Sequence, residues 1–321
     1  MSIDVHGHYL PKKQLSRYES LYESRETEEA IALLVKGSWI SFGRGLVDLS
    51  VHIADMERNG IDHRFLAVYP FYFYYEKEES VAWCRSYNDG VLQDIAPYKG
   101  NFSLLANLPM CSPLEACAEL ERVMALPSVV GAQVATNIAG KDLDAPELED
   151  FWALAEKLKA FILLHPSYVV SDPRFHPYHL RNLIGNPLDT TIAAFKLMTG
   201  GVLDRHPGLS ICLSHAGGYL PLAMSRFDHG WKVRPELAYL KESPSSFAKK
   251  FYYDTITFDA VCLEFAVARL GADRFMLGSD YPFDMSDPEP ARIVDESHLT
   301  KDERTAILSG NVQRLIGKAA K

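Results

Sequence analysis

Short, almost continuous apolar runs recur along the chain, and each is followed by a stretch with the periodicity of an amphipathic helix. Such runs are typical of parallel strands that are buried on both faces, because a half-exposed strand would alternate apolar and polar residues. Eight runs fit this description: Ser2–Val5, Arg64–Tyr69, Phe102–Leu108, Val129–Val134, Phe161–Leu164, Leu209–Ser214, Phe251–Asp254 and Phe275–Leu277. The pattern therefore predicts eight strand-and-helix units.

Local signals mark where some of the helices begin and end. Ser112-Pro113-Leu114-Glu115 indicates a capping box with proline at the first helical position. Acidic residues follow Pro146, where the helix dipole favours negative charge. Gly60 and Gly271 lie where helices are expected to stop.

Eight such units predict an α/β fold of the (β/α)8 TIM-barrel type, with a doubly wound open sheet as the alternative. The segment of about residues 10–50 is too long for a simple loop, and we expect an insertion after the first strand that covers the C-terminal mouth. No low-complexity linker interrupts the chain, so residues 1–321 are expected to form a single domain.

Composition narrows the kinds of partner. The 321 residues are 47% hydrophobic, which is ample for one large core, and the formal net charge of −9 disfavours nucleic acid and membrane partners. The five cysteines are odd in number and include no C-x-x-C pair, which disfavours a disulfide framework. The sequence shows neither a signal peptide nor an apolar run of the roughly 20 residues that span a bilayer, so we expect a soluble, cytoplasmic protein.

Polar residues stand at the C-terminal ends of four predicted strands, where a TIM barrel carries its chemistry. The first strand runs into His6-Gly7-His8, the fifth into His165, the sixth into His215 and the eighth into Asp280. In a barrel these ends meet at one mouth, so the side chains are expected to converge.

His6 and His8 are two residues apart on an extended segment, so their side chains point to one face with Cα atoms about 7 Å apart. Two imidazoles at that spacing can share one ion at zinc–nitrogen distances of about 2.0–2.1 Å. His165 and Asp280 would add a third nitrogen and an oxygen. Taken singly, each motif has an ordinary explanation as a chance pair, a loop histidine or a turn aspartate. Their shared position at strand ends favours one metal site.

The other histidines fit ordinary roles. His229 follows His215 on the next helix, where a subunit or domain contact fits its position as well as chemistry does. The rest lie in predicted helices or polar loops, where we expect them to be solvated: His52, His63, His176, His179, His206 and His298.

Together these residues resemble the amidohydrolase superfamily. The match is more specific to its amidohydrolase-2 branch, which is typified by α-amino-β-carboxymuconate-ε-semialdehyde decarboxylase. The resemblance runs along most of the chain and includes His6-x-His8, Asn107-Leu108-Pro109, Gly131-Ala132-Gln133, His165, Thr199-Gly200-Gly201-Val202, His215-Ala216-Gly217-Gly218, Arg226-Phe227-Asp228-His229-Gly230 and Gly278-Ser279-Asp280-Tyr281-Pro282-Phe283.

The resemblance implies one divalent metal ion, usually zinc, with manganese and iron as other possibilities. It implies that His6, His8, His165 and Asp280 hold this ion and that His215 is the catalytic acid/base beside it. Asp280 is the second catalytic candidate, because it would accept a proton from water in a hydrolytic reaction.

The resemblance also implies residues that bind substrate. Arg44 is matched to an arginine that meets a substrate carboxylate, and Phe283 to a residue that lines the pocket. Arg226 is matched to an arginine that reaches the neighbouring subunit's active site, so we expect a homodimer. The fourth strand carries Gln133 but no lysine or glutamate that would bridge two metals, so we expect a single ion.

These inferences predict a metal-dependent non-oxidative decarboxylase, a carboxy-lyase acting on a small carboxylated aromatic or muconate-like acid. In this mechanism the ion stabilises the charge that develops as the C–C bond breaks. His215 would give a proton to the carbon that loses CO2, because an imidazole suits proton transfer near neutral pH. Arg44 or Arg226 would bind a carboxylate through its planar guanidinium.

Two alternatives remain. A metal-dependent hydrolase of a lactone, ester or amide, or a hydratase, would use metal-bound water at the same site. A binding module with a structural metal would have no need of His215 beside the ion. The aromatic cluster of Tyr69, Phe71, Tyr72, Phe73, Tyr74 and Tyr75 fits a ring-bearing substrate, and packing under a lid or at a dimer interface explains it equally well.

Overall fold

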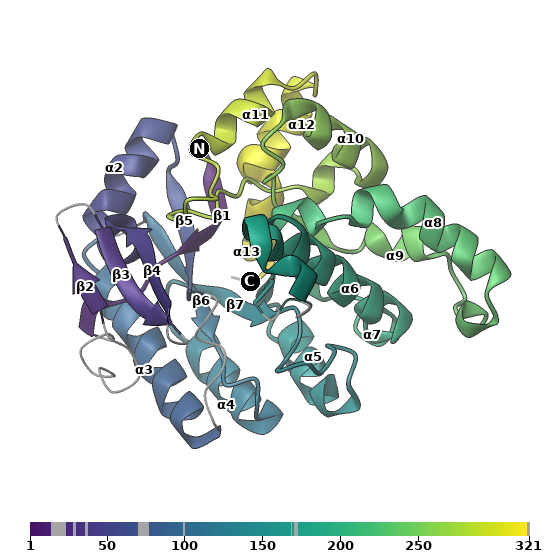
Figure 1. The fold of residues 1–321 in the computed structure, drawn as a ribbon, viewed down its shortest axis with the longest axis horizontal. Helices are drawn as coiled ribbons and strands as arrows, with labels where there is room; N and C mark the ends of the chain where they lie inside the picture. The colour runs from purple at the N-terminus through teal and green to yellow at the C-terminus, as the bar shows by residue number, and fades with distance from the viewer. Residues whose placement is uncertain are drawn as a thin grey trace.

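The computed structural model describes residues 1–13, 24–27, 30–35, 38–69, 77–98, 100–167, 169 and 173–319. Its main sheet has seven parallel strands with helices packed around them (Figure 1). In sheet order the strands are β1 (Ile3–His8), β5 (His63–Ala67), β6 (Phe102–Asn107), β7 (Val129–Ala135), β8 (Phe161–His165), β9 (Ser210–Leu213) and β10 (Tyr252–Tyr253). This order follows the chain without the reversal that defines a doubly wound sheet, so that alternative is wrong.

The eighth predicted run, Phe275–Leu277, joins the two edges of the sheet without forming a regular strand. On one side Met276 N donates to Tyr253 O at 2.8 Å, and on the other Val5 N donates to Leu277 O at 2.9 Å. The segment thus lies between β10 and β1, and the sheet curls into a TIM-barrel-like arrangement.

Helices follow the strands as the apolar pattern predicts. The longer ones are α2 (Leu49–Asn59), α3 (Lys77–Ile95), α4 (Pro113–Met124), α5 (Glu149–Lys157), α6 (Asn186–Thr199), α8 (Leu220–Val233), α10 (Ala260–Leu270) and α13 (Asn311–Ala319). The shorter ones are α7 (Val202–Arg205), α9 (Pro244–Ala248), α11 (Pro290–Glu296) and α12 (Lys301–Thr305). None of the helices among the described residues is long and apolar enough to cross a membrane.

The expected helix signals are only partly confirmed. Gly60 ends α2 in the left-handed conformation, with φ of 63°, and Gly271 ends α10. Helix α4 begins at Pro113 as predicted, but the Ser112 side chain makes no capping hydrogen bond, so the capping box there is wrong.

Two apolar layers hold the fold together. The larger lies between the sheet and the surrounding helices, and the smaller fills the interior of the barrel. The interior layer includes Val5 from β1, Phe65 from β5, Leu163 from β8 and Cys212 from β9. Val312 of α13 packs against it, so α13 contributes to the barrel interior.

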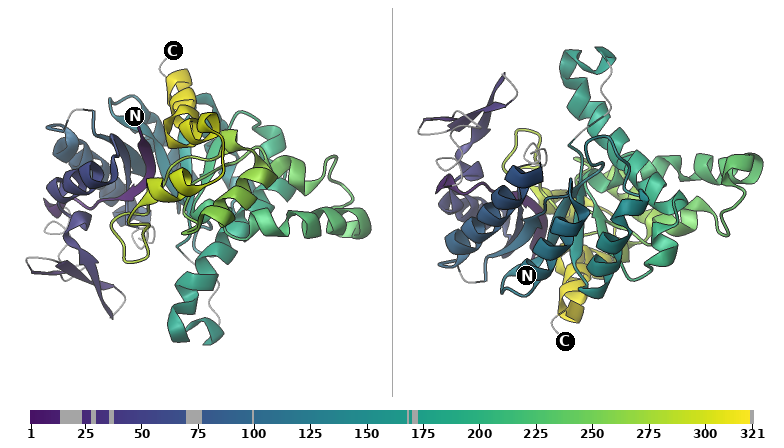
Figure 2. Two further views of the ribbon diagram at one scale, coloured as in Figure 1. Left: turned by 90° about the horizontal axis from the view of Figure 1, so that it is seen from above. Right: turned by 90° about the horizontal axis from the view of Figure 1, so that it is seen from below.

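The segment between β1 and β5 contains a second, antiparallel sheet. Its strands are β2 (Ser24–Glu26), β3 (Ala30–Val35) and β4 (Ser38–Gly43), in the order β2-β3-β4. Figure 2 shows this sheet standing away from the barrel strands, on the side opposite the chain termini. The ring of Phe42 at the end of β4 lies 4.7 Å from that of Tyr69, just after β5.

Some of the histidines that were expected to be solvated are buried. His52 on α2 is fully buried, and its Nδ1 lies 3.1 Å from the guanidinium of Arg64. That guanidinium also donates to Asp4 and Asp55 in the same network. His206 is 7% exposed and bonds to a glutamate on α5. The sequence around His52 or His206 does not reveal that these histidines are buried, because their hydrogen-bond partners lie far away in the sequence.

Candidate metal centre

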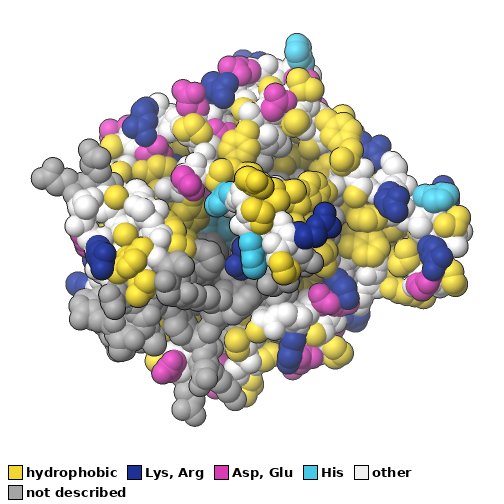
Figure 3. All heavy atoms as spheres, viewed as in Figure 1, with side chains coloured by type: hydrophobic (Ala, Val, Ile, Leu, Met, Phe, Trp, Pro, Cys, Tyr) yellow, Lys and Arg dark blue, Asp and Glu magenta, His cyan; other side chains and the backbone are white. Residues whose placement is uncertain are grey.

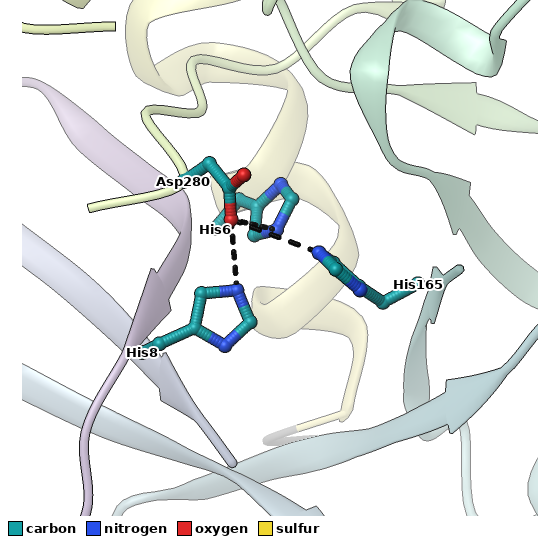
Figure 4. A group of neighbouring side chains, drawn as sticks. All are labelled: His6, His8, His165 and Asp280. Carbon is teal, nitrogen blue, oxygen red and sulfur yellow. Dashed lines mark ion pairs between the residues drawn. The ribbon is translucent and has the colours of Figure 1, made fainter. Parts of the chain in front are cut away.

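Four side chains meet at the C-terminal ends of the barrel strands. His6 and His8 come from β1, His165 ends β8, and Asp280 follows the eighth segment. Figure 4 shows the three rings and the carboxylate pointing toward one another. One potential ligand atom from each lies within 4.8 Å of the others, and all four residues are buried.

The distances in this group fit one divalent ion. Asp280 Oδ1 lies 3.0 Å from His8 Nε2, 3.2 Å from His6 Nε2 and 3.6 Å from His165 Nε2. Donor atoms that surround one ion at about 2.1 Å, at angles of roughly 90–120°, are separated by about 3.0–3.6 Å. These four atoms are also buried without a hydrogen-bond partner among the described residues, a cost that coordination of an ion would remove.

The opposite ring nitrogens orient the three imidazoles. His6 Nδ1 lies 2.8 Å from Asp254 Oδ2, His8 Nδ1 2.8 Å from Val68 O, and His165 Nδ1 2.9 Å from Pro166 O. A carbonyl or carboxylate oxygen only accepts, so each Nδ1 carries the hydrogen. In the neutral rings each Nε2 lone pair is then free to face a metal ion, which is the usual arrangement of ligating histidines.

Burial and the neighbouring carboxylates decide where protons reside in this group. Burial opposes a charge on His6, but Asp280 and Asp254 together raise the pKa of His6 to about 10. Burial dominates at the other two rings and lowers the pKa of His8 and that of His165, the latter to about 3. Burial would raise the pKa of Asp280, yet His6 and the other nearby histidines hold it well below its usual range. A metal ion would therefore compete with one proton on His6.

His215 lies next to the four ligand candidates. It follows β9, and its Nε2 is 3.4 Å from Asp280 Oδ2, the oxygen that does not face the three rings. Its ring centroid is 5.3 Å from that of His165 and 5.7 Å from that of His6. The side chain keeps 17% of its surface exposed, whereas the ring of His6 is fully buried. His215 therefore stands at the edge of the group, with access to solvent.

A largely apolar cavity of about 750 Å³ opens beside this edge. His215 and Asp280 contribute to its wall, together with residues of α10, the start of α8 and the segment 182–187. Apolar side chains that line it are Tyr219, Leu222, Ile256, Phe258, Val261 and Phe265. Figure 3 shows histidine side chains recessed in the middle of this face, with hydrophobic side chains beside them.

The three expected substrate-binding residues lie in different surroundings. The ring of Phe283 is 4.7 Å from that of His8, so it lies against the metal group. Arg44, in the short helix η1 (Arg44–Leu46), donates to Thr27 O at 3.0 Å. Arg226 is exposed on α8. None of the three is among the described residues that line the cavity, and their roles stay predictions. Phe71 to Tyr75 of the aromatic cluster lie outside the described residues.

Sequence reasoning missed Asp254, although a signal was present. It is the last residue of the seventh predicted strand, Phe251–Asp254, whereas His165 directly follows the fifth. The structure buries Asp254 fully and places its carboxylate against both His6 and His215. The rule that picks out polar residues at strand ends would have found it if applied to every strand.

A TIM-barrel-like fold with three histidines and an aspartate at its strand ends defines a class of metal-dependent enzymes. A family model described as Amidohydrolase matches residues 3–318, so the chain belongs to the amidohydrolase family. The resemblance that the sequence motifs indicated is thereby confirmed.

Curated relatives of this chain are named as decarboxylases. The chain is 27% identical over 329 residues to 2-amino-3-carboxymuconate-6-semialdehyde decarboxylase of Dictyostelium discoideum, covering 99% of this chain and 92% of that protein. It is 31% identical over 246 residues to gamma-resorcylate decarboxylase of a Polaromonas species, covering 72% and 75%. The expected kinship with decarboxylases is therefore confirmed.

Solved structures show the same fold. IDCase of Metarhizium anisopliae aligns with a TM-score of 0.87 at 23% identity, covering 100% of this chain and 98% of that one. A dihydroxybenzoic acid decarboxylase of a Polaromonas species, solved with manganese and 2-nitroresorcinol, aligns with a TM-score of 0.80 at 23% identity, covering 98% and 96%. These likenesses confirm the TIM-barrel-like fold.

Proposed function

We propose that this protein is a metal-dependent non-oxidative decarboxylase of a small carboxylated aromatic or muconate-like acid. The observation that carries the proposal is the position of His215, between a group that fits one metal ion and an apolar cavity. A proton donor, a site for a cation and an apolar surface beside them are what such a reaction needs. The decarboxylases among the relatives support the same reaction.

His6, His8, His165 and Asp280 would hold the ion, which we propose to be zinc. Three nitrogens and one oxygen also suit manganese, the metal bound in the Polaromonas decarboxylase structure. When bound, the ion would orient the substrate and stabilise the negative charge that develops during C–C cleavage.

His215 would act as the acid. When the carboxylate leaves as CO2, the bonding electron pair stays on the ring carbon, and this carbon takes a proton from the imidazole. Asp280 Oδ2 accepts from His215 Nε2 at 3.4 Å and would keep the ring in place as its charge changes. Asp280 would thus serve as both ligand and catalytic partner.

The apolar walls of the cavity would pack against the ring of the substrate. We propose that Phe283, which lies beside His8 and outside the wall of this cavity, contacts the substrate from the side of the metal group. The β2–β4 sheet would cover the C-terminal mouth as the predicted insertion, since Phe42 at its end lies 6.0 Å from Phe283. Arg44 would bind a carboxylate after leaving its present partners, which are Thr27 O at 3.0 Å and the carboxylates of Asp48 at 3.7 Å and Glu26 at 3.9 Å.

We further propose that the protein is a homodimer. Arg226 projects from the exposed side of α8, where it could enter a neighbouring subunit's site. The cytoplasmic location and the single domain over residues 1–321 stay predictions.

A substrate screen tests the proposed reaction. Metal-replete protein is incubated with γ-resorcylate, other hydroxybenzoates and 2-amino-3-carboxymuconate-6-semialdehyde, and CO2 is measured. In parallel, lactones, esters and amides are followed for hydrolysis, and unsaturated acids for hydration. We expect CO2 from at least one carboxylated acid and no turnover in the parallel assays. Hydrolysis or hydration without any CO2 release would replace the proposal by the alternative reaction at this site.

A further inference from the structure

Asp254, just after β10, is the common partner of two site histidines. One carboxylate oxygen, Oδ2, lies 2.8 Å from His6 Nδ1 and 2.9 Å from the backbone nitrogen of His215. The other, Oδ1, accepts from the backbone nitrogens of Ala216 at 2.7 Å and Ile256 at 3.1 Å. The carboxylate is fully buried, so all four bonds are shielded from water.

The bond to His6 fixes which ring nitrogen carries the hydrogen. An ionised carboxylate can only accept, so His6 Nδ1 must donate. In the neutral ring that binds a metal ion, Nδ1 therefore keeps its hydrogen and Nε2 presents its lone pair. Nε2 is the atom that lies 3.2 Å from Asp280 Oδ1 within the metal group. Asp254 therefore prepares His6 for metal binding without touching the ion.

The bonds to the backbone fix the turn that carries His215. His215 and Ala216 have φ of 54° and 52°, in the left-handed region that residues with a Cβ avoid. Asp254 accepts from the N–H of both. On the far side of the turn, a Cβ at Gly218 would collide with the carbonyl oxygen of Pro187. The turn is thus held from two sides, and the imidazole of His215 is directed at Asp280.

We propose that Asp254 is a positioning residue that sets the metal-binding tautomer of His6 and the place of His215 through one carboxylate. Its effect on metal binding depends only on the four-residue metal group, whereas its effect on turnover rests on the proposed decarboxylase function. The two effects can therefore be tested separately.

Asp254→Asn tests the tautomer of His6. The substitution keeps the shape of the Asp254 side chain but replaces one carboxylate oxygen, an acceptor, by an NH2 group, a donor. Three of the four partners are backbone N–H groups, which cannot turn into acceptors. His6 Nδ1 is the fourth, and it can accept if its hydrogen moves to Nε2. The amide NH2 is therefore best accommodated at the position of Oδ2, where it donates to His6 Nδ1. The hydrogen of His6 then lies on Nε2 and points at the metal position. The backbone N–H of His215 loses its acceptor.

The first experiment measures the affinity of metal-free protein for Zn²⁺ by competition with a chromogenic chelator. We expect Asp254→Asn to bind at least about 10- to 100-fold more weakly than the unaltered protein, the usual effect of losing such a partner. Asp287→Asn is the matched control. Asp287 is also buried, its Oδ1 accepts from Glu289 N, and its Oδ2 has no hydrogen-bond partner among the described residues. In Asp287→Asn the amide NH2 can take the place of Oδ2 while the amide oxygen still accepts from Glu289 N. The Zn²⁺ affinity of this variant should therefore stay within about twofold of that of the unaltered protein.

A folded Asp254→Asn variant with unchanged Zn²⁺ affinity would overturn the proposal. If the variant does not fold, ¹⁵N NMR of the histidine rings in the unaltered protein decides. The account expects the His6 resonance, assigned by its loss in His6→Asn, to show a protonated Nδ1 and a Zn²⁺-bound Nε2. The opposite tautomer would refute it. Neither readout involves turnover, so both remain valid if the decarboxylase proposal fails.

Discussion

At the scale of single residues, His215 is the group on which turnover depends. We expect His215→Ala to keep the metal, because none of the four candidate ligands is removed, and to lose about 100- to 10,000-fold in kcat. Metal analysis and CO2 release measured on the same sample check both parts. His298→Ala is the control, since that side chain is 92% exposed and pairs with Glu264 and not with a residue of the metal group. Full activity of His215→Ala would remove its assigned role.

His6 makes metal binding dependent on pH. Burial opposes its protonation, but the charges of Asp280 and Asp254 raise the pKa of His6 to about 10 in the metal-free protein. Below that pH an incoming ion must displace a proton, so the affinity should rise with pH by up to about tenfold per unit. Chelator competition between pH 7 and 9 measures the slope. An affinity that does not change over this range would contradict the account.

The site ligands could be predicted from the sequence because each stands within three residues of the end of an apolar run. His6, His8, His165 and Asp280 needed only the rule that the carboxyl ends of barrel strands meet at one mouth. His52 and the hydrogen bonds of Asp254 could not be foreseen in the same way. Their partners come from other strands and helices, so their burial depends on the tertiary fold.

At the scale of elements, β7 lies so close to β8 that position 131 has no room for a side chain. A Cβ at Gly131 would collide with the backbone of Phe161 on the neighbouring strand. We expect Gly131→Ala to lower the free energy of unfolding by at least the roughly 1–3 kcal/mol typical of overpacking. Gly317→Ala on α13 meets nothing within 4 Å and should be neutral or slightly stabilising. Denaturant melts compare them, and equal stability of the two variants would contradict this packing.

Most barrel strands could be predicted from their apolar runs, with ends displaced by a few residues. The last two could not be predicted in detail, since β10 has only two residues and Phe275–Leu277 is joined to its neighbours by isolated bridges and hydrogen bonds. An apolar run reports burial, whereas strand assignment also requires a regular hydrogen-bond ladder. The predicted capping box at Ser112 is wrong because that side chain makes no capping hydrogen bond, whereas Thr300 and Glu303 form a real one.

At the scale of the whole molecule, the proposed homodimer makes a distinctive prediction. If Arg226 serves the partner's site, Arg226→Ala and His215→Ala remove different halves of the same shared site. A one-to-one mixture with free subunit exchange should then recover about a quarter of full activity, because half the dimers contain one intact site of two. Each variant alone should stay nearly inactive. A mixture no more active than its components would argue against the shared site.

Decarboxylation by this barrel should depend on one divalent ion held by His6, His8, His165 and Asp280. The most direct test titrates metal-free protein with Zn²⁺, and separately with Mn²⁺, while CO2 release from the best substrate of the screen is followed. Activity should rise linearly with added metal and reach its plateau at one ion per chain. Activity without metal, or a plateau only at two ions per chain, would contradict this dependence on one ion.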